Sequence, residues 1–387
     1  MILDVLLLVI LGYFISNFYL RKLPEVSETK LASEQTQTEA KQVAQICQNN
    51  PSWHECYKTE MPKLAKTYGL KTGEEILSAL QDIDPNSRNC HVIAHFMARE
   101  AMRREPNKFH ELFDSLDVNA CGSGFLHGVL ETYLGLHPEV KVDGKFASEI
   151  CDRGNDLFRK RMCAHFVGHI FLLNEEGNLS QALASCTGIK TEWLYDCYDG
   201  MFMEDHQKLA LSEHGISPLP DLTDEYTKGL EQECQKHSDI QAAACWTEMA
   251  EMYAHKYGYV PDIVYKNCEK APEQYRKSCY GKGVVAISIY TGFDTQEQLK
   301  SICRFYEANI EDYKWCVSSM VSSFMYYSPK FTERGITLCS NIQNGLQEWC
   351  FENLGSALKN IVSSPADREN FCRASPEKFR HVCATTN

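Results

Sequence analysis

The chain has 387 residues and a formal net charge of -13, and its composition is 44% hydrophobic and 24% charged. These proportions are typical of a folded protein and exclude a chain that is disordered throughout. The negative charge also excludes a broad nucleic-acid surface, which needs Lys and Arg gathered on one face. We therefore expect no nucleic-acid partner, and a length that suits two ordinary domains or one extended repeat array.

The chain begins with an apolar run, MILDVLLLVILGYFISNFYL, in which Asp4 is the one charged residue. As a helix it would span about 30 Å, the thickness of a bilayer core. Because no basic segment precedes it and no small-residue cleavage pattern follows, residues 1–22 predict an uncleaved transmembrane anchor rather than a signal peptide. A buried core helix is the alternative. Residues 23–46 are polar and predict a tether between the membrane and the folded body.

The eighteen cysteines fall into a regular series of pairs. Eight pairs are close in sequence, and five of these have a separation of eleven residues. The pairs are Cys47 and Cys56, Cys151 and Cys163, Cys186 and Cys197, Cys234 and Cys245, Cys268 and Cys279, Cys303 and Cys316, Cys339 and Cys350, and Cys372 and Cys383. Structural zinc usually shows CxxC spacing, which is missing here, so the pairs predict disulfides.

Cys90 and Cys121 stand apart from this series. We expect them to bridge each other, which would complete nine disulfides. A redox-active pair, or two thiolate ligands beside the neighbouring histidines, is the alternative.

The first members of the pairs from Cys151 onward recur at steps of 35, 48, 34, 35, 36 and 33 residues. A period of about 34–36 is typical of a two-helix repeat, in which the first cysteine ends helix A and the second lies near the start of helix B. The long step contains DHQKLALSEHGISPLPDLTDEY. We therefore predict His-rich repeats at residues 47–206, an insertion loop at 207–233 and C-terminal repeats at 234–387.

In period and cysteine placement, residues 47–387 resemble the disulfide-bridged members of the tetratricopeptide-like class. The WxxLGxxY motif of ordinary tetratricopeptide repeats is missing. The resemblance implies an all-α solenoid of αα-hairpin repeats pinned by disulfides. It also implies a right-handed superhelix whose concave face is lined by one set of helices and often binds a peptide or protein.

Two signals disagree on the side of the membrane that holds the body. Arg21 and Lys22 follow the apolar run and favour the cytoplasm by the positive-inside tendency. Disulfides, however, form in oxidising compartments. We give the cysteines more weight and predict a periplasmic or extracellular body.

Nine of the thirteen histidines lie between His54 and His206. Five of them lie on three consecutive predicted B helices, at similar distances from the cysteine that begins each helix. The three segments are CHVIAHFMARE, CGSGFLHGVLE and CAHFVGHI. Residues four apart share one helix face, and neighbouring helices pack about 8–10 Å apart, so these side chains can converge. The candidate metal ligands are His91, His95, His127, Glu131, His165 and His169.

Glycines lie among these histidines, at Gly122, Gly124, Gly128 and Gly168. Each costs up to about 1 kcal/mol in a helix relative to alanine. Such positions indicate that a backbone or a ligand approaches closely. Close packing, with histidines that only satisfy buried polar groups, explains the same pattern without a metal.

Two functional hypotheses follow. In the first, the site binds zinc, copper or iron, or holds haem between helices, and Glu131 or Glu204 acts as a general base beside a metal-bound water. In the second, no metal binds and the B-helix face of the array is a scaffold for a protein or peptide.

Overall fold

Every regular element in the described part of the chain is a helix. The computed structural model describes residues 26–385 apart from 85–86, 88–89, 116–119, 154–156, 291–300, 304–305, 307–308, 328, 343–344 and 363. Its α-helices are α2 (Val26–Cys47), α3 (Trp53–Tyr68), α4 (Leu70–Ile83), α5 (His91–Arg104), α6 (Phe109–Ser115), α7 (Gly124–Leu136), α8 (Gly144–Cys151), α9 (Leu157–Asn174), α10 (Leu179–Cys186), α11 (Leu194–Gln207), α12 (Leu209–Glu213), α13 (Asp224–Cys234), α14 (Asp239–Lys256), α15 (Pro261–Cys268), α16 (Glu273–Tyr290), α18 (Ile310–Tyr327), α19 (Thr332–Asn341), α20 (Gln347–Ile361), α21 (Pro365–Cys372) and α22 (Glu377–Thr385).

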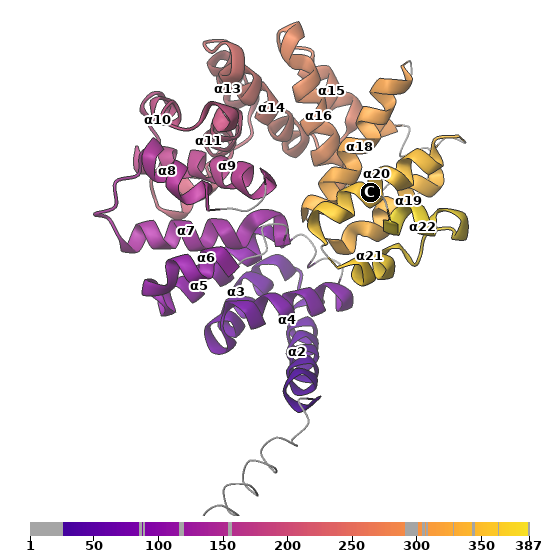
Figure 1. Cartoon of the computed structure of the whole chain (residues 1–387). Coiled ribbons are helices and arrows are strands. Elements are labelled where there is room, and N and C mark those ends of the chain that lie inside the picture. Colours follow the sequence, from indigo (N-terminus) through magenta and orange to yellow (C-terminus); the bar gives the residue numbers. More distant parts are fainter. Residues whose placement is uncertain are drawn as a thin grey trace, which may run out of the picture.

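The helices form successive hairpins, each made of an A helix and a B helix, as Figure 1 shows. Several A helices begin at a residue whose side chain accepts backbone N–H groups of the first turn: Asp143 before α8, Asn178 before α10, Thr223 before α13 and Ser364 before α21. Such caps satisfy donors that have no partner within the helix, so they fix where the helix starts.

All nine predicted cysteine pairs are disulfides, with Cα atoms 5.1 to 6.0 Å apart. Helices α8, α10, α13, α15 and α21 end at the first cysteine of their pair, as the spacing predicts. Cys90 and Cys121 bridge each other, and no described cysteine is free. The structural interpretation of this pair is therefore confirmed.

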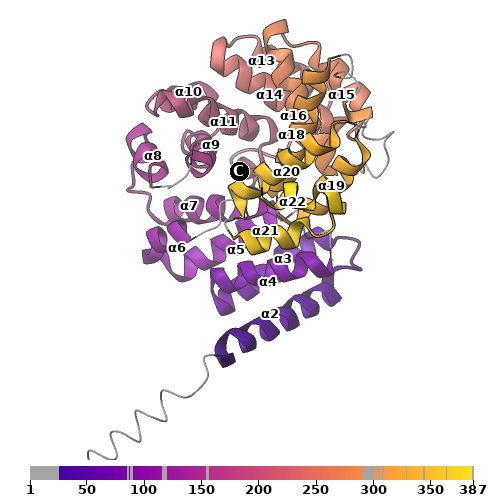
Figure 2. The same ribbon diagram turned by 45° about the vertical axis from the view of Figure 1, so that its right-hand side comes forward.

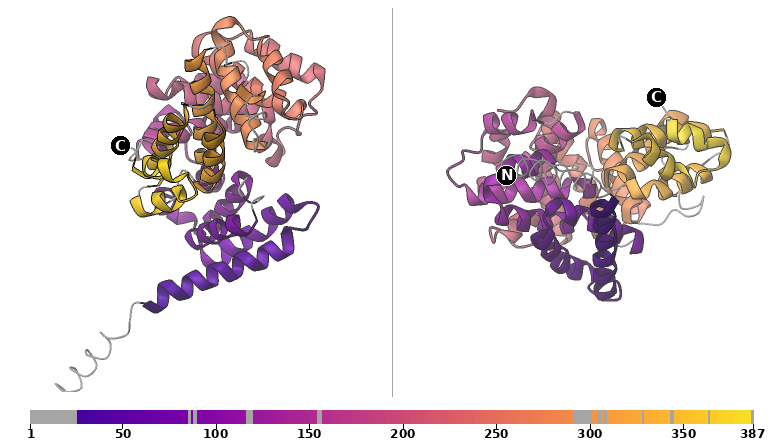
Figure 3. Two further views of the ribbon diagram at one scale, coloured as in Figure 1. Left: turned by 90° about the vertical axis from the view of Figure 1, so that its right-hand side faces the viewer. Right: turned by 60° about the horizontal axis from the view of Figure 1, so that its bottom comes forward.

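Consecutive B helices (α3, α5, α7, α9, α11, α14, α16, α18, α20 and α22) contact one another along the whole array. The array curls, so that the last hairpins come back beside the first, as Figures 2 and 3 show. The 3₁₀ turn Ala120–Ser123 contacts α18, and Lys330 lies 2.5 Å from Asp82 in an ion pair. The inner face of the curl is therefore made of B helices, and the predicted metal ligands all lie on them.

Two of the predicted domain boundaries need correction. The expected tether, residues 23–46, is helical from Val26, and Ala40, Val43 and Ala44 of α2 are buried in the core. Its C-terminal turns carry apolar residues at helical spacing, so they pack. The expected insertion loop, 207–233, includes α13, which is the A helix of the next hairpin. The inserted segment proper ends before Asp224.

Within the described residues, no helix combines the length and the apolar character needed to cross a bilayer. The predicted anchor, residues 1–22, lies outside the part that the structure describes.

Removing one disulfide tests the contribution of the cysteine ladder. The Cys268–Cys279 bridge has a sequence separation of 11 and Cys90–Cys121 one of 31. In the chain-entropy account the first stabilises by about 3 kcal/mol and the second by about 4 kcal/mol. We expect the double variant Cys90→Ser, Cys121→Ser to lose more free energy of unfolding than Cys268→Ser, Cys279→Ser, as measured by urea denaturation. Equal losses would contradict this ordering.

Candidate functional site

A cavity of about 670 Å³ opens on the inner face of the array. It is lined by side chains from α3, α5, α7, α9, α11, α12, α14 and α16 and from the loop after α12. The six predicted ligands, His91, His95, His127, Glu131, His165 and His169, all line it. The structure thus gathers the predicted set around one space.

Glycines bring the histidine-bearing helices into backbone contact. A Cβ atom on Gly124 would lie 2.2 Å from the carbonyl oxygen of His91, and one on Gly128 would lie 2.2 Å from that of His95. Since Cβ atoms do not approach backbone oxygens so closely, α5 and α7 can pack this way only with glycine at both positions. Gly168 and Gly200 play the same part between α9 and α11.

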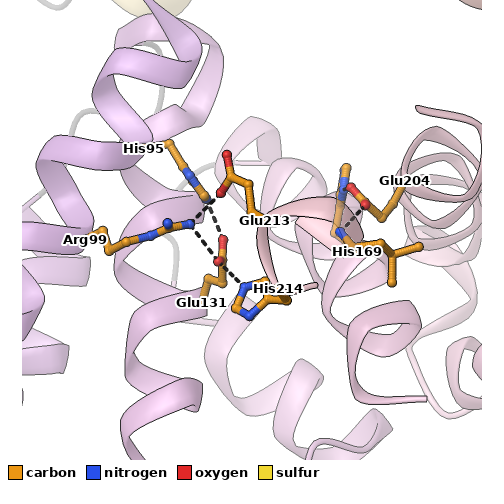
Figure 4. Close-up of polar contacts among 8 residues, drawn as sticks. His95, Arg99, Glu131, His169, Glu204, Glu213 and His214 are labelled. Carbon is orange, nitrogen blue, oxygen red and sulfur yellow. Dashed lines mark hydrogen bonds and ion pairs between the residues drawn. The ribbon is translucent and has the colours of Figure 1, made fainter. Parts of the chain in front are cut away.

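His165 and His169 form a pair at the centre of the lining. Each Nδ1 faces a carboxylate of α11: His165 Nδ1 is 3.1 Å from Asp199 Oδ2, and His169 Nδ1 is 3.3 Å from Glu204 Oε2. The two Nε2 atoms lie 3.2 Å apart. Figure 4 shows His169 with Glu204 beside it. This is the carboxylate–histidine arrangement that orients imidazole ligands of metals.

The protonation that these contacts require leaves two lone pairs facing each other. A carboxylate accepts hydrogen bonds, so each Nδ1 donates its hydrogen and each Nε2 is unprotonated when the ring is neutral. Burial lowers the pKa of His169, despite the opposing hydrogen bond to Glu204, and favours its neutral form. Two unprotonated nitrogen atoms 3.2 Å apart repel each other through their lone pairs unless a cation, either a proton or a metal ion, lies between them.

The separation also fits a metal ion. Two imidazole nitrogens bound at about 2.0–2.1 Å in a tetrahedral site lie roughly 3.3 Å apart. The axial ligands of a haem iron lie on opposite sides of the metal, roughly 4 Å apart for the same bond length. The observed 3.2 Å between ligands from a single helix turn therefore favours a metal ion over haem at this pair.

His91 and His127 lie beside this pair. Burial lowers the pKa of His91 to about 4 and that of His127 well below its ordinary value, so both rings are neutral near pH 7. His91 Nδ1 donates to the carbonyl oxygens of Gly122 at 2.9 Å and Cys121 at 3.2 Å. His127 is 6% exposed, and its Nε2 has no hydrogen-bond partner among the described residues. Its ring centroid lies 5.6 Å from that of His169.

Glu131 occupies a different part of the cavity, in a network of charges (Figure 4). Its Oε2 lies 2.6 Å from His95 Nε2, and its Oε1 accepts hydrogen bonds from Arg99 at 2.9 Å and His214 at 2.6 Å. Arg99 also pairs with Glu213 at 2.7 Å. Burial would raise the pKa of Glu131, but the hydrogen bonds from His214 and His95 outweigh it and hold the pKa far below its ordinary range.

Both predicted general bases are therefore engaged by other groups. Glu131 is stabilised as an anion by its ion pairs, which makes it a weak base. Glu204 holds His169 through Oε2 and accepts the Leu211 N–H at 2.8 Å through Oε1. The geometry favours positioning roles for both, and their catalytic roles stay predictions.

A buried ion cluster closes the cavity on the side of α14 and α16. Lys282 Nζ lies 3.0 Å from Glu248 Oε1 and 3.1 Å from Glu251 Oε2. Burial would lower the pKa of Lys282, but the two carboxylates more than compensate and raise it well above its ordinary value. Glu248 is 1% exposed, and burial raises the pKa of its carboxyl group. Within this wall of the cavity, the charge of Lys282 is therefore compensated by neighbouring carboxylates.

Residues 208–222, which we call the cover segment, lie over the cavity and contribute Leu209, Ala210, Glu213, Leu219, Pro220 and Leu222 to its lining. The segment is held by Glu213 on Arg99, by His214 on Glu131 and by the Leu211 N–H on Glu204. The sequence marks it as an insertion but gives no sign that it reaches the histidines.

The six predicted ligands line one cavity without forming one compact ligand set. Among the described residues, the group of three His, Cys, Asp or Glu ligand atoms within 4.8 Å of one another is His206, Cys234 and Cys245. Those two cysteines are joined in a disulfide, so their sulfurs are not thiolates. The predicted set instead divides into the His165–His169 pair, the His95–Glu131 pair, and His91 and His127 between them.

The structure adds residues that the sequence prediction did not select. Arg99, Glu213, His214 and Lys282 all belong to the ion pairs around the cavity. Arg99 lies four residues after His95, so the helical spacing could have predicted that both side chains share one helix face. His214 lies in the insertion, which has no helical periodicity from which its position could be predicted.

No family model matches this chain, and no curated protein or solved structure is similar to it at a significant level. The resemblance to tetratricopeptide-like repeats therefore concerns architecture alone.

The Glu131 network is expected to stabilise the fold. Glu131→Gln removes one of the two anions that pair with the largely buried Arg99, whose side chain is 15% exposed and which keeps its contact with Glu213. A hydrogen bond to a charged group typically contributes about 1.5–3 kcal/mol. We expect a loss of that size in urea unfolding. Glu149→Gln, which breaks an exposed pair with Lys145, is the matched control and should change stability by under about 1 kcal/mol. Similar losses in both variants would contradict this expectation.

The attachment of the cover segment is expected to depend on pH. The hydrogen bond to Glu131 raises the pKa of His214, while burial and Arg99 oppose the rise and Glu213 adds to it. A raised pKa in the folded state means that the contact stabilises fully below about pH 6.5 and is lost as the pH rises through the raised value. Proteolysis within residues 208–222, corrected with an unstructured peptide of the same sequence, should therefore be slower at pH 6 than at pH 9.

His214→Gln should remove most of this pH dependence, because the titrating partner of Glu131 is lost. An unchanged dependence in this variant would show that another group controls the attachment.

Proposed function

We propose that the protein binds a transition metal ion through Nε2 of His165 and His169. The observation that carries the proposal is the 3.2 Å separation of two Nε2 atoms whose Nδ1 partners are carboxylates. Asp199 and Glu204 act as positioning residues that fix the orientation of each imidazole. The ring of His127 lies beside the pair, but among the described residues its nitrogens do not form a compact group with the two Nε2 atoms.

The charges of the site support a cation. Asp199 and Glu204 supply two carboxylates, while burial keeps His127 and His169 uncharged. A divalent ion would balance the two carboxylates, since buried charge is tolerated only when it is paired. Neutral imidazole suits zinc, copper and iron alike, so the ligand set does not select among them.

The nine disulfides are typical of proteins that mature in an oxidising compartment. We infer that the hairpin array is a solenoid of the tetratricopeptide-like kind. Its body would lie on the periplasmic or extracellular side, and residues 1–22 would anchor it in the membrane. The alternative function, a metal-free scaffold for a protein or peptide, stays a prediction.

Metal analysis tests the proposal. The full chain, purified without a histidine tag, is dialysed against equimolar zinc, copper and iron, desalted and analysed by mass spectrometry for metal content. We expect about one equivalent of one metal in the native chain and its loss in His165→Ala, His169→Ala. Asp199→Asn and Glu204→Gln keep the ligands but weaken their orientation, so each should bind roughly 10- to 100-fold more weakly.

His206→Ala is the matched control. His206 is fully buried on α11, two residues after Glu204, but it is not among the residues that line the cavity. Unchanged metal content in this variant supports the proposal. Metal that persists without His165 and His169, or that disappears with His206, would assign the site elsewhere. A native chain that binds no metal would mean that the two imidazoles share a proton.

A further inference from the structure

We propose that the same cavity also holds an uncharged, largely apolar organic ligand beneath the cover segment. This inference goes beyond the proposed metal site, because the apolar part of the cavity can hold such a ligand whether or not a metal is bound.

The volume exceeds what a metal needs. A metal ion with two or three bound waters occupies roughly 100 Å³, given about 30 Å³ for each water. The cavity measures about 670 Å³. Sites for organic ligands typically measure about 300–1,000 Å³. Most of the space therefore matches a small organic molecule.

Much of the remaining lining is apolar and comes from several elements, although His54, Gln207 and His255 also contribute to it. Its larger apolar side chains are Met162, Phe166, Met203, Leu219, Leu222 and Met252. Water in such a space lacks hydrogen-bond partners, so replacing it with apolar surface is favourable. Methionine side chains are flexible and adapt to ligands of different shape.

The charges in the wall already have partners, which decides the charge of the ligand. Each charged lining residue already has a partner: Glu131 and Glu213 contact Arg99, Glu251 contacts Lys282, and Asp199 and Glu204 face the His165–His169 pair that we propose to bind a metal cation. A charged headgroup would have to break one of these pairs or remain buried without a counter-charge. An uncharged molecule avoids that cost. A hydroxyl or carbonyl oxygen on it can still face the His165–His169 pair.

The cover segment provides a route for entry. Leu209 and Leu219 are 49% and 58% exposed although they also line the cavity. The segment therefore forms a single layer between the cavity and solvent. Its ties to the array include the polar contacts of Glu213, His214 and the Leu211 N–H, and the buried side chain of Leu211.

Photolabelling of the full chain tests this inference. The probes are three eight-carbon compounds that carry the same diazirine and differ in the terminal group: an alcohol, a carboxylate and an ammonium. Labelled peptides are mapped by mass spectrometry, with and without excess 1-octanol. We expect the alcohol to label peptides from α9, α11 or α14 in a saturable manner that 1-octanol suppresses. The carboxylate and ammonium probes should label those peptides at least tenfold less.

Val285→Trp places a large side chain in the cavity wall, away from the proposed ligands, and should reduce the labelling at least tenfold. Gln274→Trp, at an exposed position of the same helix α16, is the matched control and should leave it unchanged. Any of three results would overturn the inference. The alcohol probe fails to label the cavity peptides, the Val285→Trp variant is labelled as strongly as the native chain, or a charged probe labels these peptides as strongly as the alcohol does.

The same experiment on His165→Ala, His169→Ala separates the two proposals. Labelling that survives the loss of both histidines supports the apolar site whatever the result of the metal analysis. A native chain that binds metal but is not labelled leaves the metal site standing and refutes the ligand.

Discussion

The direct backbone contact between neighbouring B helices is the constraint on which the cavity depends. The contacted atoms are the carbonyl oxygens of His91, His95 and His165, and the residues that touch them are Gly124, Gly128 and Gly200. A methyl group at any of these glycines would push the helices apart and separate the histidines that they carry. The glycines therefore set the distances between candidate ligands, and their intrinsic cost of up to about 1 kcal/mol each is offset by that packing.

This close packing also explains why three of the imidazoles remain neutral. Burial disfavours the charged form of His91, His127 and His169, and carboxylates of α11 orient the pair on α9. Apart from Cys90–Cys121, the disulfides join the end of an A helix to the start of a B helix, so they stabilise each hairpin independently of the cavity.

The sequence predicted the hairpins and the disulfides because both depend on local spacing. A helix that ends at a cysteine eleven residues before its partner needs no long-range information. Five of the cavity histidines were also predictable, because repeats place equivalent residues at equivalent helical positions, whereas His54 and His255, which line the cavity as well, were not selected. The pairing of His169 with Glu204 and the reach of His214 to Glu131 were not predictable. Both contacts depend on the angle between hairpins and on the path of an insertion. Neither can be predicted from the periodicity of the sequence.

Glu204 joins the two parts of the site in a single side chain. One carboxylate oxygen accepts from His169 and the other from the backbone of Leu211 in the cover segment. Hydrogen bonds to a charged group typically contribute about 1.5–3 kcal/mol, and both share one carboxylate orientation. A change that reorients His169 therefore alters the attachment of the cover, and the reverse holds to the same degree because such coupling is reciprocal. If a metal ion binds the histidine pair as we propose, its binding and the closure of the cavity would be linked through Glu204.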